Sequence, residues 1–274
     1  MTTNLQNWAA HVTFQASTVH YPETVEQLQE IVARSRKLKV IGSRHCFNDI
    51  ADTNGEQVSL DRLAPTLRFD EARRTVTVNG GITYGELCEQ LNAQGVAIHN
   101  MASLPHITVA GAIATATHGS GDKNGNLATA VAAIELVKAN GDLVTLSRDK
   151  DGDEFQGAVV GLGGLGIVTK VSFDLMPAFW MQQEVYEDLP VAQLDEHFDE
   201  ITGAGYSVSL FTDWQKNRVN QVWIKRRLSG PTPLALAPRF FGATPAPLDR
   251  HPVVTLSAAP CTEQMGVVGP WHQR

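Results

Sequence analysis

The most constraining feature of this 274-residue sequence is a run of small and hydroxyl-bearing residues over 102–121. The run reads ASLPHITVAGAIATATHGSG, and its hydroxyl groups recur at Thr108, Thr115, Thr117 and Ser120. Small side chains let a backbone approach a ligand closely, while hydroxyls and amides supply hydrogen bonds without net charge. The alternative is a crossing of helices built from small residues, with His118 as a buried structural histidine. Because surface loops seldom contain so many small apolar residues, the run favours ligand contact.

A second constellation is the loop Ile41-Gly42-Ser43-Arg44-His45-Cys46-Phe47, which follows a short buried strand expected over 38–42. Glycine and serine after a strand allow successive free N–H groups to hold a pyrophosphate. His45 can serve as an acid, a base, a ligand or a nucleophile. On local chemistry alone, a tight loop with a solvated Arg44–His45 pair is the favoured interpretation.

A third pattern, Gly161-Leu-Gly163-Gly-Leu-Gly166, matches G-x-G-x-x-G. A nicotinamide-binding fingerprint needs a helix directly after the glycines. Here the residues from Ile167 to Leu175 alternate like a strand. We therefore interpret the match as coincidental and not as a nicotinamide-binding fingerprint.

Local periodicity predicts an alternation of helices and strands before residue 176. A helix is expected after Pro22, with strands over 74–80 and 166–175. Thr83 and Glu86 have the spacing of a capping box for a second helix that ends at Gly95. Asn140-Gly141 separates two apolar runs over 131–147, which is typical of a hairpin. The pattern changes near Met176-Pro177, where we place a domain boundary.

Residues 229–274 have weak periodicity and many prolines. One interpretation is a disordered tail, and the other is a chain cut in the middle of a domain. The apolar residues in this stretch, including Phe240 and Phe241, favour the cut.

Composition excludes several classes of function. The 22 basic and 29 acidic residues give a net charge of −7, which argues against nucleic acid or an acidic membrane as a partner. We find neither a membrane-length apolar run nor a secretory signal, and three scattered cysteines favour a reducing, cytoplasmic location. No metal-type spacing, hydrolase elbow or P-loop is present in the sequence, so we expect no metal site.

Three blocks together carry a resemblance to a known family: VIGSRHCFNDIADTNG (40–55), ASLPHITVAGAIATATHGSG (102–121) and VVGLGGLGIVTKVSFDL (159–175). Their order and separation resemble the FAD-linked oxidases of the vanillyl-alcohol-oxidase superfamily, with the best likeness to alditol (xylitol) oxidases and aldonolactone oxidases. The resemblance implies an α+β fold, with a two-subdomain FAD-binding domain of the PCMH type over 1–176. It also implies the beginning of an α+β substrate (cap) domain over 177–274, truncated at its C-terminal end.

The resemblance also implies roles for individual residues. The first block would wrap the FAD pyrophosphate through Ile41, Gly42, Ser43, Arg44, His45 and Cys46. His45 would bond covalently to the 8α carbon of the flavin, because a neutral imidazole is a good nucleophile. Cys46 is assigned no linkage, and Ser103 would contact flavin and substrate as the one visible catalytic residue. Further cofactor contacts would come from Thr108, Gly111, Thr115, Thr117, His118 and Ile167.

The implied activity is FAD-dependent oxidation of a CH–OH group in a polyol, such as xylitol or sorbitol. Dioxygen would be the acceptor, and the products would be an aldose and hydrogen peroxide. The alternatives are an aldonolactone oxidase or dehydrogenase of the D-arabinono-1,4-lactone type, and a truncated, non-catalytic FAD-binding fragment. We name no catalytic base, because the family's substrate-binding residues would lie beyond residue 274.

Overall fold

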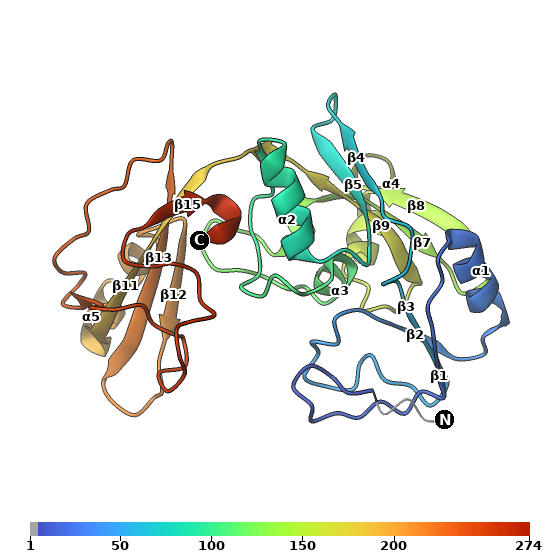
Figure 1. Cartoon of the computed structure of the whole chain (residues 1–274), viewed down its shortest axis with the longest axis horizontal. Coiled ribbons are helices and arrows are strands. Elements are labelled where there is room, and N and C mark those ends of the chain that lie inside the picture. Colours follow the sequence, from blue (N-terminus) through green and yellow to red (C-terminus); the bar gives the residue numbers. More distant parts are fainter. Residues whose placement is uncertain (1–4) are drawn as a thin grey trace. The chain divides into compact units, whose positions relative to one another are not determined.

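The computed structural model describes residues 5–274, which divide into two compact units (Figure 1). Unit 1 contains residues up to Leu91, Ile98–His118 and Gly125–Met176. Unit 2 contains Asn92–Ala97, Gly119–Asn124 and Pro177–Arg274. Two short segments from the first half of the chain therefore belong to unit 2. The assignment of 177–274 to a substrate domain stays a prediction.

A small parallel sheet opens unit 1. Its strands are β1 (Thr18–His20), β3 (Glu56–Ser59) and β2 (Leu38–Ile41), in the order β1-β3-β2. Helix α1 (Val25–Arg34) begins where the Thr24 hydroxyl accepts a hydrogen bond from the backbone N–H of Gln27. Its buried residues Leu28 and Val32 pack with Val58 of β3, as the periodicity of the predicted helix requires.

A five-stranded antiparallel sheet forms the larger part of unit 1. Its order is β4-β5-β9-β7-β8, with bounds Leu67–Asp70, Thr75–Asn79, Ile167–Asp174, Val131–Val137 and Leu143–Ser147. The predicted hairpin is confirmed, because β7 and β8 pair across Asn140-Gly141, where Gly141 has φ +86°. The prediction that a strand and not a helix follows the glycines 161–166 is confirmed as well, because the chain enters strand β9 directly after Gly166.

Four helical segments complete unit 1 around this sheet: α2 (Tyr84–Ala93, whose last two residues belong to unit 2), α3 (Val109–Ala114), the 3₁₀ helix η1 (Leu127–Ala130) and α4 (Arg148–Val159). The predicted capping box is confirmed. The backbone N–H of Thr83 donates to Glu86 Oε2 at 3.0 Å, and the N–H of Glu86 donates to Thr83 Oγ1 at 3.3 Å. Only the middle of the small-residue run is helical, because α3 ends before Thr115.

Unit 2 is built on long strands β11 (Trp180–Pro190) and β13 (Arg218–Leu228), which pair antiparallel. Shorter strands β12 (Ser207–Phe211), β14 (Thr244–Pro245) and β15 (Val268–Pro270) extend this sheet, and β6 (Val96–Ala97) pairs with β10 (Met176–Pro177). The helices are α5 (Val191–Glu196), α6 (Phe198–Thr202) and the 3₁₀ helix η2 (Trp271–Gln273).

The proline-rich stretch 229–274 packs onto this sheet. Strand β15 pairs with β11 from Val268 to Pro270, and the side chain of Gln264 is buried. These contacts argue against the disordered-tail interpretation. Among residues 5–274, no helix combines the length and hydropathy needed to cross a bilayer.

Candidate functional site

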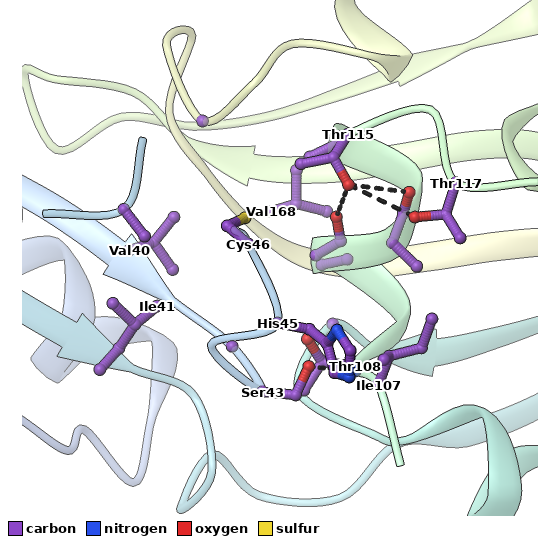
Figure 2. Close-up of a pocket in the computed structure, with 18 of the residues that line it drawn as sticks. Val40, Ile41, Ser43, His45, Cys46, Ile107, Thr108, Thr115, Thr117 and Val168 are labelled. Atoms are coloured by element: carbon purple, nitrogen blue, oxygen red, sulfur yellow. Dashed lines mark hydrogen bonds between the residues drawn. The ribbon is translucent and has the colours of Figure 1, made fainter. Parts of the chain in front are cut away.

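Unit 1 contains a cavity of about 650 Å³, within the usual range for small-molecule sites. Its walls are the loop after β2, the small-residue run around α3, and the glycine-rich turn before β9 (Figure 2). Strands β7 and β9 contribute side chains between these loops. The three sequence blocks singled out above therefore lie around a single cavity.

Nearly all predicted site residues line this cavity. They are Ile41, Gly42, Ser43, Arg44, His45, Cys46, Ser103, Thr108, Gly111, Thr115, Thr117 and His118. The side chain of Ile167 does not. It is buried against Leu28, Val32 and Val58, because successive side chains of β9 point to opposite faces and Val168 faces the cavity instead. A backbone contact from Ile167 stays a prediction.

Glycines allow the walls to approach each other closely. A Cβ atom on Gly42 would lie 2.1 Å from Thr108 Oγ1, and one on Gly111 would lie 2.8 Å from the same oxygen. The backbone N–H of Thr108 also donates to Ser43 Oγ at 3.4 Å. The loop after β2 and the start of α3 are thus closely packed, with Gly42 and Gly111 both against the Thr108 side chain.

Hydroxyl groups collect at the C-terminal end of α3. Thr115 Oγ1 donates to the carbonyl of Gly111 at 2.9 Å and lies 3.4 Å from Thr117 Oγ1 (Figure 2). The neighbouring Ala116 has φ +55°, so the chain turns sharply between the two threonines. Leu162, in the glycine-rich turn, donates its N–H to the carbonyl of Ala114 at 3.0 Å. These bonds hold the C-terminal end of α3 in place next to the glycine-rich turn.

His45 brings a buried ring nitrogen to the cavity. Its Nε2 is buried and has no hydrogen-bond partner among the described residues. Burial lowers the pKa of His45, and the nearby His106 lowers it further, against an opposing backbone hydrogen bond of His45 itself. A lowered pKa keeps the imidazole neutral at neutral pH, which is the nucleophilic form.

Cys46 is a weaker candidate nucleophile than the neighbouring His45. Burial raises the pKa of its thiol, so the reactive thiolate is disfavoured. The absence of a linkage at Cys46 stays a prediction. Within residues 5–274, no group of three or more histidine, cysteine or acidic side chains is placed to hold a metal ion.

Several residues that line the cavity were not predicted from the sequence. Gly80 and Gly81 follow β5 directly, and a Cβ on Gly80 would lie 2.4 Å from the carbonyl oxygen of Val168. Leu162 and Leu165 add apolar surface from the glycine-rich turn. The adjacent glycine pair after a clear strand was the available signal for a close backbone approach.

Comparison with known proteins supports the resemblance seen in the sequence. Residues 16–147 match the family model of an FAD binding domain. The whole chain is 46% identical to an alditol oxidase from Streptomyces sp.. These matches fit the vanillyl-alcohol-oxidase superfamily of FAD-linked flavoproteins. They bear out the predicted α+β fold with an FAD-binding domain of the PCMH type, and FAD as the cofactor.

More distant relatives of this flavoprotein match a smaller part of it. L-gulonolactone oxidase from Mus musculus is 35% identical over 64% of the chain, and L-gulono-1,4-lactone dehydrogenase from Mycobacterium tuberculosis is 31% identical over 71%. The chain spans 65% of the length of the alditol oxidase and 40% and 45% of these two relatives.

The residues of the cavity fit FAD. Gly42 and Gly111 let the cavity walls come close together at Thr108, and loops of this kind can hold a pyrophosphate through backbone N–H groups. The Nε2 of His45 is a buried polar atom without a hydrogen-bond partner among the described residues, and a bound group would satisfy it. Lys39 and Arg44 add positive charge at the cavity wall, which suits the phosphates.

Proposed function

We propose that this flavoprotein oxidises a CH–OH group of a polyol, an alditol such as xylitol or sorbitol, with dioxygen as acceptor. The products are the aldose and hydrogen peroxide. The observation that carries the proposal is the 46% identity to an alditol oxidase, which extends over the whole chain. By contrast, the two lactone-oxidising relatives described above match 64% and 71% of the chain.

FAD, when bound, supplies the ring that accepts hydride from the carbinol carbon and passes the electrons to dioxygen. The chain's own residues bind and orient this group. Ser43, Thr115 and Thr117 offer hydroxyls along the cavity walls. Ser103 is exposed at the cavity and is proposed to contact both flavin and substrate.

We further propose that His45 bonds covalently to the flavin methyl group. Three observations support this: His45 lines the cavity, its Nε2 has no hydrogen-bond partner within residues 5–274, and its pKa is lowered so that the neutral form dominates. A neutral imidazole is the nucleophile that such a bond requires.

The alternative substrate is an aldonolactone of the D-arabinono-1,4-lactone type. The matches to lactone-oxidising relatives over 64% and 71% of the chain support it. A further alternative is a non-catalytic FAD-binding fragment, for which the match of residues 16–147 to an FAD binding domain is sufficient support. The predicted cytoplasmic location stays a prediction.

The first experiment is a visible spectrum of the purified protein, followed by acid precipitation and flavin fluorescence of the pellet. We expect a yellow protein whose flavin stays in the pellet, and release of that flavin in His45→Ala but not in the control His251→Ala. A folded, colourless protein contradicts the FAD assignment, and flavin in the supernatant contradicts the covalent bond. Hydrogen peroxide formed with xylitol, sorbitol or an aldonolactone distinguishes the substrates, and none from any of them favours the fragment.

A further inference from the structure

The N-terminal residues 5–14 form a hairpin that closes on itself. Gln6 and Thr13 form an isolated antiparallel bridge, and the N–H of Phe14 donates to the carbonyl of Leu5 at 2.8 Å. We call residues 5–14 the N-terminal strap. At its centre the Asn7 side chain is 4% exposed, and its Oδ1 accepts the backbone N–H groups of residues 11 and 12 at 3.1 and 3.0 Å.

The strap is hydrogen-bonded to the backbone on both sides of His45. The N–H of Trp8 donates to the carbonyl of Arg44 at 2.8 Å, and Asn7 Nδ2 donates to the carbonyl of Cys46 at 2.9 Å. The Arg44 guanidinium in turn donates to the carbonyl of Gln6 at 3.0 Å. These bonds secure a loop in which Arg44 has φ +58°, a left-handed conformation that disfavours most side chains.

Trp8 fixes the plane of the His45 ring. The two rings are stacked with centroids 4.4 Å apart and planes 21° apart. The indole is 57% exposed, so hydrophobic burial gives only a partial reason for its position. It also stacks on His106 at 6.1 Å. Neither Asn7 nor Trp8 lines the cavity, so both act on His45 from outside the space that a cofactor would fill.

We propose that the N-terminal strap is a positioning element for flavin attachment, in which Asn7 fixes the His45 backbone and Trp8 fixes the His45 imidazole. This inference rests on the proposed covalent bond at His45. That bond replaces one imidazole N–H and one methyl C–H of the flavin. The two electrons and two protons released reduce the bound FAD, and dioxygen takes them up as hydrogen peroxide.

Covalent attachment of FAD and its noncovalent binding depend on different parts of the structure. Bond formation requires the nitrogen and carbon to be held about 3–3.5 Å apart in line, and a misplacement of about 1 Å can lower a rate roughly 10²-fold. Binding of FAD depends instead on the cavity walls, which do not include Asn7 or Trp8. Loosening the strap therefore slows attachment while FAD binding persists.

The experiment uses apoprotein from a riboflavin-starved host, mixed with FAD. Noncovalent binding is measured as flavin retained on gel filtration, and attachment as the rate at which flavin becomes acid-stable. For Trp8→Ala we expect an attachment rate lowered about tenfold to a hundredfold, with FAD stoichiometry unchanged. Trp8→Phe keeps a flat ring and should recover to within about threefold of the wild-type rate. The matched control Trp214→Ala, at an 86% exposed tryptophan of unit 2, should attach flavin at the wild-type rate.

Asn7→Asp separates the two functions of the asparagine. It retains the oxygen that closes the strap but loses the donor to the Cys46 carbonyl, so we expect slow attachment in a folded protein. A wild-type attachment rate in Trp8→Ala or Asn7→Asp overturns the inference. Equal losses of FAD binding and of attachment also overturn it, because they indicate a merely structural strap. If the wild-type protein itself never forms acid-stable flavin, the bond at His45 is refuted, and the inference falls with it.

Discussion

Substitution of Gly42 by alanine tests whether the close approach of the cavity walls is required. The added Cβ would lie 2.1 Å from Thr108 Oγ1, more than an ångström inside ordinary contact, which begins at 3.4 Å. Thr108 cannot withdraw easily, because it is 5% exposed and its backbone is fixed at the start of helix α3, where its carbonyl accepts the N–H of Ala112 at 3.0 Å. Gly42 has no positive φ, so its backbone conformation is compatible with alanine. Any loss of stability in Gly42→Ala would therefore come from the clash with Thr108 and not from backbone strain.

The expected magnitude follows from overpacking of a closely packed wall. Such insertions cost about 1–3 kcal/mol of unfolding free energy. At about 2–4 °C per kcal/mol for a chain of comparable size, Gly42→Ala should lower the Tm by roughly 2–12 °C. Because the clash displaces two cavity walls, we also expect FAD affinity to fall about tenfold or more, which corresponds to about 1.4 kcal/mol.

A second substitution at the clashing residue turns this into a double-mutant cycle. Thr108→Ala removes Oγ1 and leaves the Thr108 Cβ 3.3 Å from the new methyl group, a contact that small shifts relieve. Gly42→Ala with Thr108→Ala should therefore recover stability, with a coupling energy of about 0.5–3 kcal/mol. Thr108→Val is the matched control, because its methyl group occupies the place of Oγ1 and should give no rescue.

The measurements are thermal unfolding of the apoprotein and titration of FAD by quenching of flavin fluorescence. A Gly42→Ala protein with wild-type Tm and FAD affinity would refute the argument. So would additive effects in the double mutant, because they would mean that the two residues do not meet. Equal rescue by alanine and valine at Thr108 would show that the oxygen position is not the cause.

Three further predictions concern single groups. His106→Gln removes a group that lowers the pKa of His45, so the pH midpoint above which flavin attachment becomes fast should move upward, as measured by acid-stable flavin against pH. Tyr84→Phe removes a buried hydroxyl without a hydrogen-bond partner among the described residues, and should raise the unfolding free energy by about 1 kcal/mol in a urea titration. Arg226→Ala leaves the 2% exposed Glu184 without its charged partner and should cost about 3–5 kcal/mol by the same titration; a cost below about 1 kcal/mol would contradict this reasoning.

Local signals in the sequence predicted local structure well. The capping box at Thr83, the hairpin at Asn140-Gly141 and the strand after Gly166 each depend on residues within a few positions of one another. Such short-range structure can be predicted from the sequence, because a cap or turn is formed by residues that are neighbours in the chain. The cavity was predicted differently, because the resemblance joined three blocks that periodicity alone could not bring together.

Features that depend on distant pairing were not predicted. The strap reaches Arg44 and Cys46 through Trp8 and Asn7, yet nothing in the sequence of the strap marks these residues as partners of that loop. The cavity-facing side chain of Val168 was not predicted either, because a one-residue change of register exchanges the two faces of a strand; the backbone contact from Ile167 stays a prediction. The grouping of Asn92–Ala97 and Gly119–Asn124 with unit 2 also has no local signal.

The cavity gathers its walls from residues between Lys39 and Val168, and this affects when FAD can be captured during synthesis. A ribosome adding about 5–20 residues per second needs roughly 6–26 s to make that much chain. Until β9 has emerged, the loop after β2 and the glycine-rich turn cannot close around the dinucleotide. The nascent protein therefore passes through a period in which its cofactor cannot stabilise it, and the yield of holoenzyme should depend on the FAD supply once synthesis has passed Val168.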